Sequence, residues 1–301
     1  MLLLTLALAN DAEYRGSDSD MIELRERLRL LDETQRREES KWERAVEHTW
    51  TLDIYGCPSN LEASITEEVM LAFAPDIGDS ITSILFVETT YFREHVSSAN
   101  TVAFAHYSNI VAVKKPTCST PVQSYDLRTF LAHEIAHVRT FNIHNYQDLF
   151  PREGRSQTGD KRTLRQKWAS LDSCSVTYVG DDWKKLTTTP DGLVRKYGAK
   201  TWMEDVATFV EVTNLIAYHA KLDDRALDRL HDAYQGNAQH KKCLQNKLEK
   251  ANAFRFLDDE TADLVREVWA SSTPTSSALK TKLQSLRETI HARNREALKD
   301  R

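Results

Sequence analysis

Glycine and proline are both scarce in this sequence, with nine and seven copies among 301 residues. So few helix breakers exclude a collagen-like or linker-rich chain and favour helices. The sequence also lacks any apolar run of the roughly 20 residues that a membrane-spanning helix needs. We therefore expect a helix-rich protein with no integral membrane segment.

Positive charge is not in excess either, because 40 Lys and Arg residues face 45 Asp and Glu residues, giving a formal net charge of −5. Nucleic-acid binders use cationic side chains to neutralise phosphates, so we expect no nucleic-acid partner. The hydrophobic share of 41% is enough for a buried core and excludes global disorder. The length fits one large domain or two small ones, and the composition does not indicate an oligomeric state.

The sequence has no CxxC pair, which argues against a cysteine-ligated zinc ion. Its four cysteines are Cys57, Cys118, Cys174 and Cys243. In an oxidising compartment they would form two disulfides, with three connectivities open.

The chain starts with a short apolar run, MLLLTLALA, which ends in the small-x-small pattern Ala7-Leu8-Ala9. This run resembles the end of a secretory signal with cleavage before Asn10. It predicts a secreted or extracytoplasmic protein. No Lys or Arg precedes the run, so a plain apolar N-terminus is the alternative interpretation.

Hydrophobic periodicity predicts one helix, then several strands with a helix among them, then helices only. The expected helices cover 21–48, 60–73, 126–141, 164–171 and 202–221, and the expected strands cover 49–55, 81–87, 101–107 and 109–113. From residue 223 to 301 the pattern indicates three or four amphipathic helices, broken at Gly236 and near 271–276. This order predicts an α+β fold with a small sheet beside a helical lobe.

An HExxH motif, His133-Glu134-Ile135-Ala136-His137, lies in the expected helix 126–141. Positions i and i+4 share one face of a helix, so both imidazoles can bind the same metal ion. Glu134 lies at the edge of that face, where a carboxylate can take a proton from an activated water. The motif therefore predicts a catalytic zinc site.

A catalytic zinc ion needs a third protein ligand and an open coordination position. The metzincin pattern would need Gly at position 140 and His at 143, where this sequence has Thr140 and Ile143, and His144 comes one residue late. The other candidate is Glu204, at the start of the expected helix 202–221. An acid at a helix start is also favoured by the helix dipole alone.

With Glu204 as the third ligand, the chain resembles the gluzincins, HExxH peptidases whose third ligand is a glutamate on a later helix. The resemblance is closer to lethal-factor-like and other secreted zinc-binding peptidases, which have Glu-x-x-Ala on that helix and a tyrosine seven residues upstream. Here these residues are Glu204, Ala207 and Tyr197. The resemblance covers about residues 105–215.

This resemblance implies a zincin-like fold, in which a small mixed sheet packs on the HExxH helix and zinc is held by His133, His137 and Glu204. It implies a zinc metallopeptidase that hydrolyses internal bonds of a peptide or protein substrate. Glu134 would be the general base, and Tyr197 would donate a hydrogen bond to the developing oxyanion.

Composition, periodicity and the resemblance together divide the chain into three parts. Residues 1–20 would be a signal segment and a disordered start, 21–222 a zincin-like catalytic domain with an N-terminal helix, and 223–301 a helical C-terminal extension. In zincins an edge strand before the HExxH helix pairs with the substrate, and strand 109–113 is at that place in the sequence; the alternative is a strand that only covers the helix.

Related peptidases often have a second acid four residues after the glutamate ligand, where this chain has Thr208. Asp205 and Glu211 are the other candidates for a side chain that hydrogen-bonds a ligand imidazole. Cleavage specificity is not encoded in any of these motifs.

Other classes of function compete with the peptidase. The long charged helices at 21–48 and 223–301 fit a non-catalytic interaction protein that retains a zincin core. A metzincin-like site that uses His144, a hydrolase of non-peptide amides and a metal-dependent toxin domain are the remaining alternatives.

Overall fold

The computed structural model describes residues 53–56, 58–74, 77, 81, 83–90, 92, 101–106, 110–143, 168, 174 and 176–299. Several sequence predictions lie outside these residues: the segment 1–20, the helix 21–48, Cys57, His144 and most of the helix 164–171.

Within the described residues, the sheet has four strands: β1 (Asp53–Gly56), β2 (Ser83–Glu88), β3 (Ala103–His106) and β4 (Ile110–Lys115). Their order is β1-β2-β4-β3, and only β3 runs antiparallel to its neighbour. The side chains of Ile84–Val87 in β2 are all buried. Continuous apolar runs of this kind are typical of strands that are covered on both faces.

The expectation that the 109–113 strand forms the substrate-binding edge is wrong. This strand, β4, lies between β2 and β3 and is hydrogen-bonded on both sides, so β3 lies at the edge among the described strands. Two consecutive apolar strands look alike in sequence. Which of them lies at the edge of the sheet depends on tertiary pairing, so the local pattern does not distinguish them.

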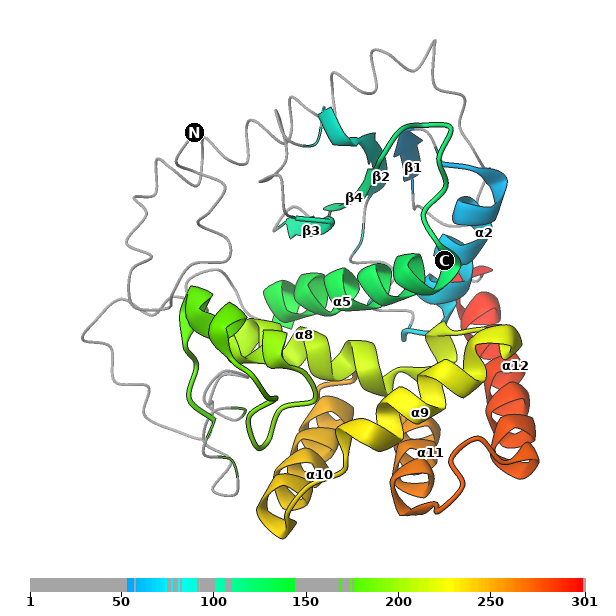
Figure 1. Ribbon diagram of the computed structural model, residues 1–301. Helices are drawn as coiled ribbons and strands as arrows, with labels where there is room; N and C mark the ends of the chain where they lie inside the picture. Colours follow the sequence, from blue (N-terminus) through cyan, green and yellow to red (C-terminus); the bar gives the residue numbers. More distant parts are fainter. Residues whose placement is uncertain are drawn as a thin grey trace.

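Helix α5 (Ser124–Ile143) contains the HExxH motif and lies directly beneath the sheet in Figure 1. It packs against β3 and β4 on one side, against α8 (Trp202–Thr213) on the other, and against α2 (Asn60–Leu71). Its fully buried residues include Leu127, Leu131, Ile135 and Val138. Their spacing of three or four residues gives α5 the apolar stripe that a packed helix needs.

Helix α8 is buried at every position, so it is a central helix of the core. It ends at Thr213, earlier than the predicted helix 202–221. Asn214 leaves the helical conformation (φ −79°, ψ 72°), and its side-chain amide donates to the carbonyl of Ala72. Two short 3-10 turns, η5 (Leu215–Ala217) and η6 (Ala220–Leu222), follow.

Four helices follow, as expected: α9 (Asp223–Ala233), α10 (Ala238–Ala253), α11 (Asp259–Ala270) and α12 (Ser277–Lys299). They lie on the side of α8 that faces away from the sheet (Figure 1). Their apolar side chains join those of the sheet, α5 and α8 in one continuous core. The fold is therefore α+β, as predicted.

A disulfide between Cys174 and Cys243 links the segment before the 3-10 turn η3 (Gly180–Lys185) to α10, which confirms the expectation of disulfides. Cys118 is disulfide-bonded as well. Among the helices that the structure describes, none combines the length and the hydropathy needed to cross a membrane.

Candidate metal centre

Three of the predicted site residues converge on one point between α5 and α8. The Nε2 atoms of His133 and His137 are 3.2 Å apart, and they lie 3.0 and 3.2 Å from Oε2 of Glu204. All three side chains are buried. Their ligand atoms lie within 4.8 Å of one another, so this group can hold a metal ion.

Local structure explains how Glu204 reaches the imidazoles. Thr201 caps α8, because its hydroxyl accepts a hydrogen bond from the main-chain N–H of Glu204, which places Glu204 in the first turn. Ala207, one turn later, is fully buried, and α8 packs closely on α5. A small side chain there allows the close approach of the two helices.

Glu211 is the acid that hydrogen-bonds the His133 imidazole, a choice that the sequence left open. Its Oε2 lies 3.0 Å from Nδ1 of His133. Glu204 and Glu211 are seven residues apart, about two helical turns, so they share one face of α8. His133 therefore lies between two carboxylates, one on each ring nitrogen. Thr208 instead donates to the carbonyl of Glu204.

Two arginines hold Glu211 in place. Both Arg195 and Arg229 donate to its Oε1. Burial opposes ionisation of Glu211, but the hydrogen bond to His133 and the two guanidinium charges lower its pKa to about 2. No sequence motif indicated either arginine, and Arg229 comes from α9, in the segment expected to be an extension.

The charges around the imidazoles are strongly coupled. Burial disfavours the charged form of His133, yet its hydrogen bonds to Glu204 and Glu211 raise its pKa to about 10. Burial likewise opposes ionisation of Glu204, but hydrogen bonds to the two imidazoles bring its pKa well below the ordinary value. The carboxylates thus favour a positive charge among the side chains of His133, His137 and Glu204. Two imidazoles and one carboxylate are a ligand set that fits a zinc ion.

Glu134 lies beside this group and faces the edge strand. Burial raises its pKa above the ordinary value, although the charges of His133 and His137 oppose the shift. The main-chain N–H of Ala105 in β3 donates a hydrogen bond to its carboxylate. Glu134 is therefore oriented, half-buried and more basic than an exposed glutamate.

Tyr197 lies in the 3-10 turn η4 (Lys196–Ala199), and its hydroxyl donates to Oε1 of Glu204 at 2.7 Å. The two carboxylate oxygens of Glu204 thus have different partners: Oε2 faces the imidazoles, and Oε1 accepts the hydrogen bond of the phenol. Burial and the charge of Glu204 raise the pKa of Tyr197, so the phenol stays protonated. An edge contact with Trp183, with ring centroids 4.9 Å apart, supports the ring.

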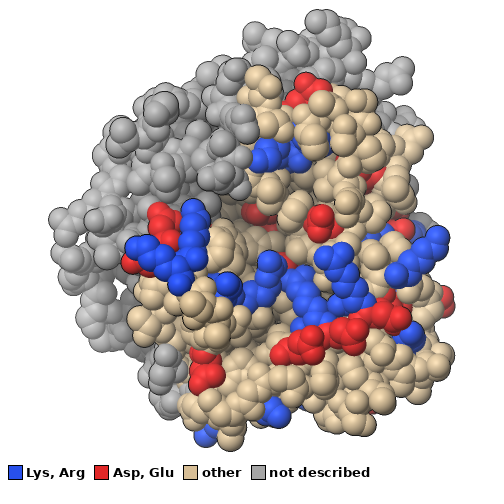
Figure 2. Space-filling view, in the orientation of Figure 1, with Lys and Arg blue, Asp and Glu red and all other residues tan. Residues whose placement is uncertain are grey.

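The group opens into a cleft of about 1440 Å³ between β3, α5, η4 and α9. Its apolar wall includes Val102, Phe104, Phe130 and Phe141, and its basic side chains are Lys184, Arg195, Lys200, Arg225 and Arg229. Figure 2 shows Lys and Arg gathered in a band across the middle of this face, with a row of Asp and Glu below it.

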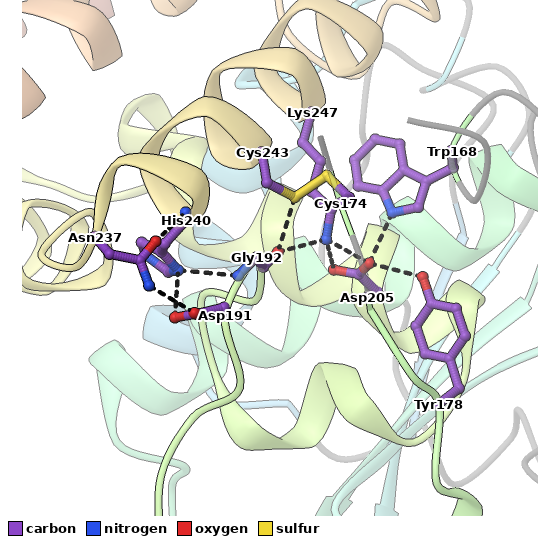
Figure 3. The surroundings of a disulfide bond; sticks show 10 residues. All are labelled: Trp168, Cys174, Tyr178, Asp191, Gly192, Asp205, Asn237, His240, Cys243 and Lys247. Carbon is purple, nitrogen blue, oxygen red and sulfur yellow. Dashed lines mark hydrogen bonds and ion pairs between the residues drawn. A yellow bond between two sulfur atoms is a disulfide. The ribbon is translucent and has the colours of Figure 1, made fainter. Parts of the chain in front are cut away.

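Asp205 follows Glu204 about 100° around α8, and it points towards Trp168, Tyr178 and Lys247 (Figure 3). It accepts hydrogen bonds from Lys247 at 2.6 and 2.8 Å, and from Trp168 and Tyr178 at 2.9 Å. Lys247 also donates to the carbonyl of Gly192 at 2.6 Å. Asp205 therefore ties α8 to α10 and to the turn at Gly192, next to the Cys174–Cys243 disulfide.

Comparison of the chain with protein-family models, with curated proteins and with solved structures found no match. The function must therefore be argued from the chemistry of the site. That chemistry consists of three convergent side chains that can hold a metal ion, one neighbouring carboxylate, one phenol and an open cleft.

Proposed function

We propose that this protein is a zinc-dependent endopeptidase with a zincin-like fold. The observation that carries the proposal is the convergence of His133, His137 and Glu204 beside Glu134 in an open cleft. A zinc ion held by these three side chains would supply a Lewis acid and would activate water at neutral pH.

Glu134 is assigned as the general base. A carboxylate with a raised pKa, held by the N–H of Ala105, is suited to accept a proton from the attacking water. The same carboxyl group then delivers that proton to the leaving amine nitrogen. No other acid in the cleft lies next to a ligand imidazole on the same helix.

Tyr197 is assigned as a donor to the substrate oxygen that becomes negative. Its hydroxyl already lies beside the candidate metal ligands, where it donates a hydrogen bond to Oε1 of Glu204. A small rotation of the phenol would redirect this hydrogen bond toward the cleft. A donor that is used only in the transition state lowers the barrier without tighter substrate binding.

The edge strand supports a peptide as the substrate. The N–H of Lys114 donates to the carbonyl of Val102 at 2.9 Å, and hydrogen-bonded and non-bonded pairs alternate along antiparallel strands. Ala103 and Ala105 therefore direct their main-chain groups away from β4, and of these groups the N–H of Ala105 is bonded to Glu134. An extended peptide can pair with this edge, as in other cases of strand addition.

The proposal is tested by zinc content and cleavage together. The purified protein is stripped with a chelator, reloaded with zinc and incubated with a mixed library of quenched peptides. We expect one zinc ion per chain and cleavage at internal bonds, abolished by the chelator and restored by zinc. Zinc binding with no cleavage of any peptide would overturn the endopeptidase and favour the non-catalytic or non-peptide alternatives.

A further inference from the structure

Lys200 is a buried lysine beside Glu204 that has no role in the proposed mechanism. Its side chain is 6% exposed and lines the cleft. The ammonium Nζ lies 3.8 Å from Oε1 of Glu204 and 5.6 Å from the centre of the Tyr197 ring. Buried lysines are rare unless their charge is paired, so this position requires an explanation.

The backbone of Lys200 is fixed on both sides. Its N–H donates to the carbonyl of Tyr197 at 3.0 Å, and its carbonyl accepts from the N–H of Gly180 at 3.1 Å. Lys200 also precedes Thr201, the residue that caps α8. The backbone of Lys200 is therefore held beside the cleft by η3, η4 and the start of α8.

Glu204 does not satisfy the hydrogen-bond donors of the Lys200 ammonium. The separation of 3.8 Å is longer than a hydrogen bond, and the nearby oxygen already accepts from Tyr197 at 2.7 Å. Among the described residues, no acceptor lies within hydrogen-bond distance of Nζ. By contrast, the buried Lys247 has three such oxygens. The donors of Lys200 are thus left for a group that enters the cleft.

We propose that Lys200 is a further catalytic residue, whose ammonium donates a hydrogen bond to the substrate carbonyl oxygen as that oxygen becomes negative. This inference rests on the proposed function. Lys200 and Tyr197 would form a pair of donors on the same side of Glu204. A fixed positive charge in a partly dry site stabilises a developing anion more strongly than a neutral donor does.

The test replaces the ammonium and measures two independent quantities. Lys200→Met keeps the length of the side chain, and Lys200→Gln serves as a second variant if the first fails to fold. In zinc-loaded protein, we expect kcat to fall about 10²–10³-fold with little change in KM. Calorimetry should show about 10- to 100-fold weaker binding of a phosphinic tripeptide with leucine-like side chains, which carries a tetrahedral anion.

Lys185→Met is the matched control, because Lys185 is an exposed lysine of η3 that does not line the cleft and is paired with Asp182 at 2.7 Å. Its kcat and its phosphinic affinity should equal those of the wild type. Thermal unfolding and zinc affinity of the Lys200 variants should also stay at the wild-type level. A loss of zinc affinity that matches the loss of kcat would overturn the proposal, because Lys200 would then act through Glu204.

Unchanged kcat and phosphinic affinity in both Lys200 variants would also overturn it. Failure of the proposed function looks different: the wild type would bind zinc but cleave no peptide. The phosphinic affinities of the wild type and the variants would then decide the role of Lys200. A wild type that does not bind the phosphinic peptide would overturn both proposals.

Discussion

Glu204 and Asp205 are consecutive acids on α8, and both are buried, yet their surroundings differ in kind. Glu204 faces two imidazoles at the floor of a cleft, and Asp205 faces an ammonium and an indole inside the core. A tyrosine donates to each acid, Tyr197 to Glu204 and Tyr178 to Asp205. The carboxylate of Glu204 thus faces the cleft, whereas that of Asp205 is held by its partners inside the core.

The difference lies in the partners. The charge of Asp205 is neutralised by Lys247, and both of its oxygens accept hydrogen bonds. Glu204 is neutralised by imidazoles, whose protons a metal ion can replace. We therefore expect changes on the cleft side to alter zinc binding and turnover, and changes on the core side to alter stability.

The largest expected effect is on turnover, from Glu134→Gln. The amide cannot accept a proton, and general-base catalysis contributes about 10²–10⁴-fold, so kcat should fall by that factor. Zinc content and thermal unfolding should equal those of the wild type, because no ligand changes. Wild-type turnover in this variant, measured on the best library peptide, would exclude Glu134 as the base.

On the core side, Lys247→Met should lower the free energy of unfolding by about 3–5 kcal/mol, because it leaves the buried carboxylate of Asp205 without a counter-charge. Urea denaturation measures the change, with the exposed Lys242→Met on the same helix as the control. The double variant with Asp205→Asn should recover part of the loss. An effect no larger than that of the control would show that the pair contributes little.

The two tyrosines provide the most direct comparison. Tyr197→Phe should lower kcat about 10²–10³-fold with a smaller change in KM, because the donor acts in the transition state. Tyr178→Phe removes the equivalent donor from Asp205 and should cost about 1–2 kcal/mol of stability with kcat unchanged. Equal kcat values for the two variants would contradict the division between cleft and core.

The smallest expected effect is on zinc affinity, from Glu211→Gln. The carboxylate holds the His133 ring, and removing such a partner typically weakens metal binding about 10- to 100-fold. Competition with a chromophoric chelator measures the affinity, and Glu249→Gln, on the exposed face of α10, is the control. A variant with wild-type affinity would show that the Arg195 and Arg229 cluster around Glu211 is purely structural.

Local spacing accounts for what the sequence could predict of the site. His133 and His137 face the same point because they are one helical turn apart. Glu211 was identifiable in principle, since it is two turns from Glu204, whereas Asp205 lies about 100° around the helix. The choice depended on how α8 is rotated against α5, and that rotation is set by packing.

Tertiary pairing accounts for what the sequence could not predict. Arg229 reaches Glu211 only because α9 folds back beside α8, and nothing local to Arg229 indicates this. The edge position of β3 depends in the same way on strand order. The early end of α8 coincides with a contact of Asn214 with Ala72, 142 residues away in sequence.

The Cys174–Cys243 disulfide also determines how this protein would respond to a cut in its chain. The covalent loop spans 69 positions and includes Tyr197, Lys200, Glu204 and Arg229. Residues 187–189 within it are exposed, the kind of segment that proteases cleave first. A cut there would release no fragment. The nicked protein would migrate as one band without reductant and as two with it, so non-reducing gels alone would report it as intact.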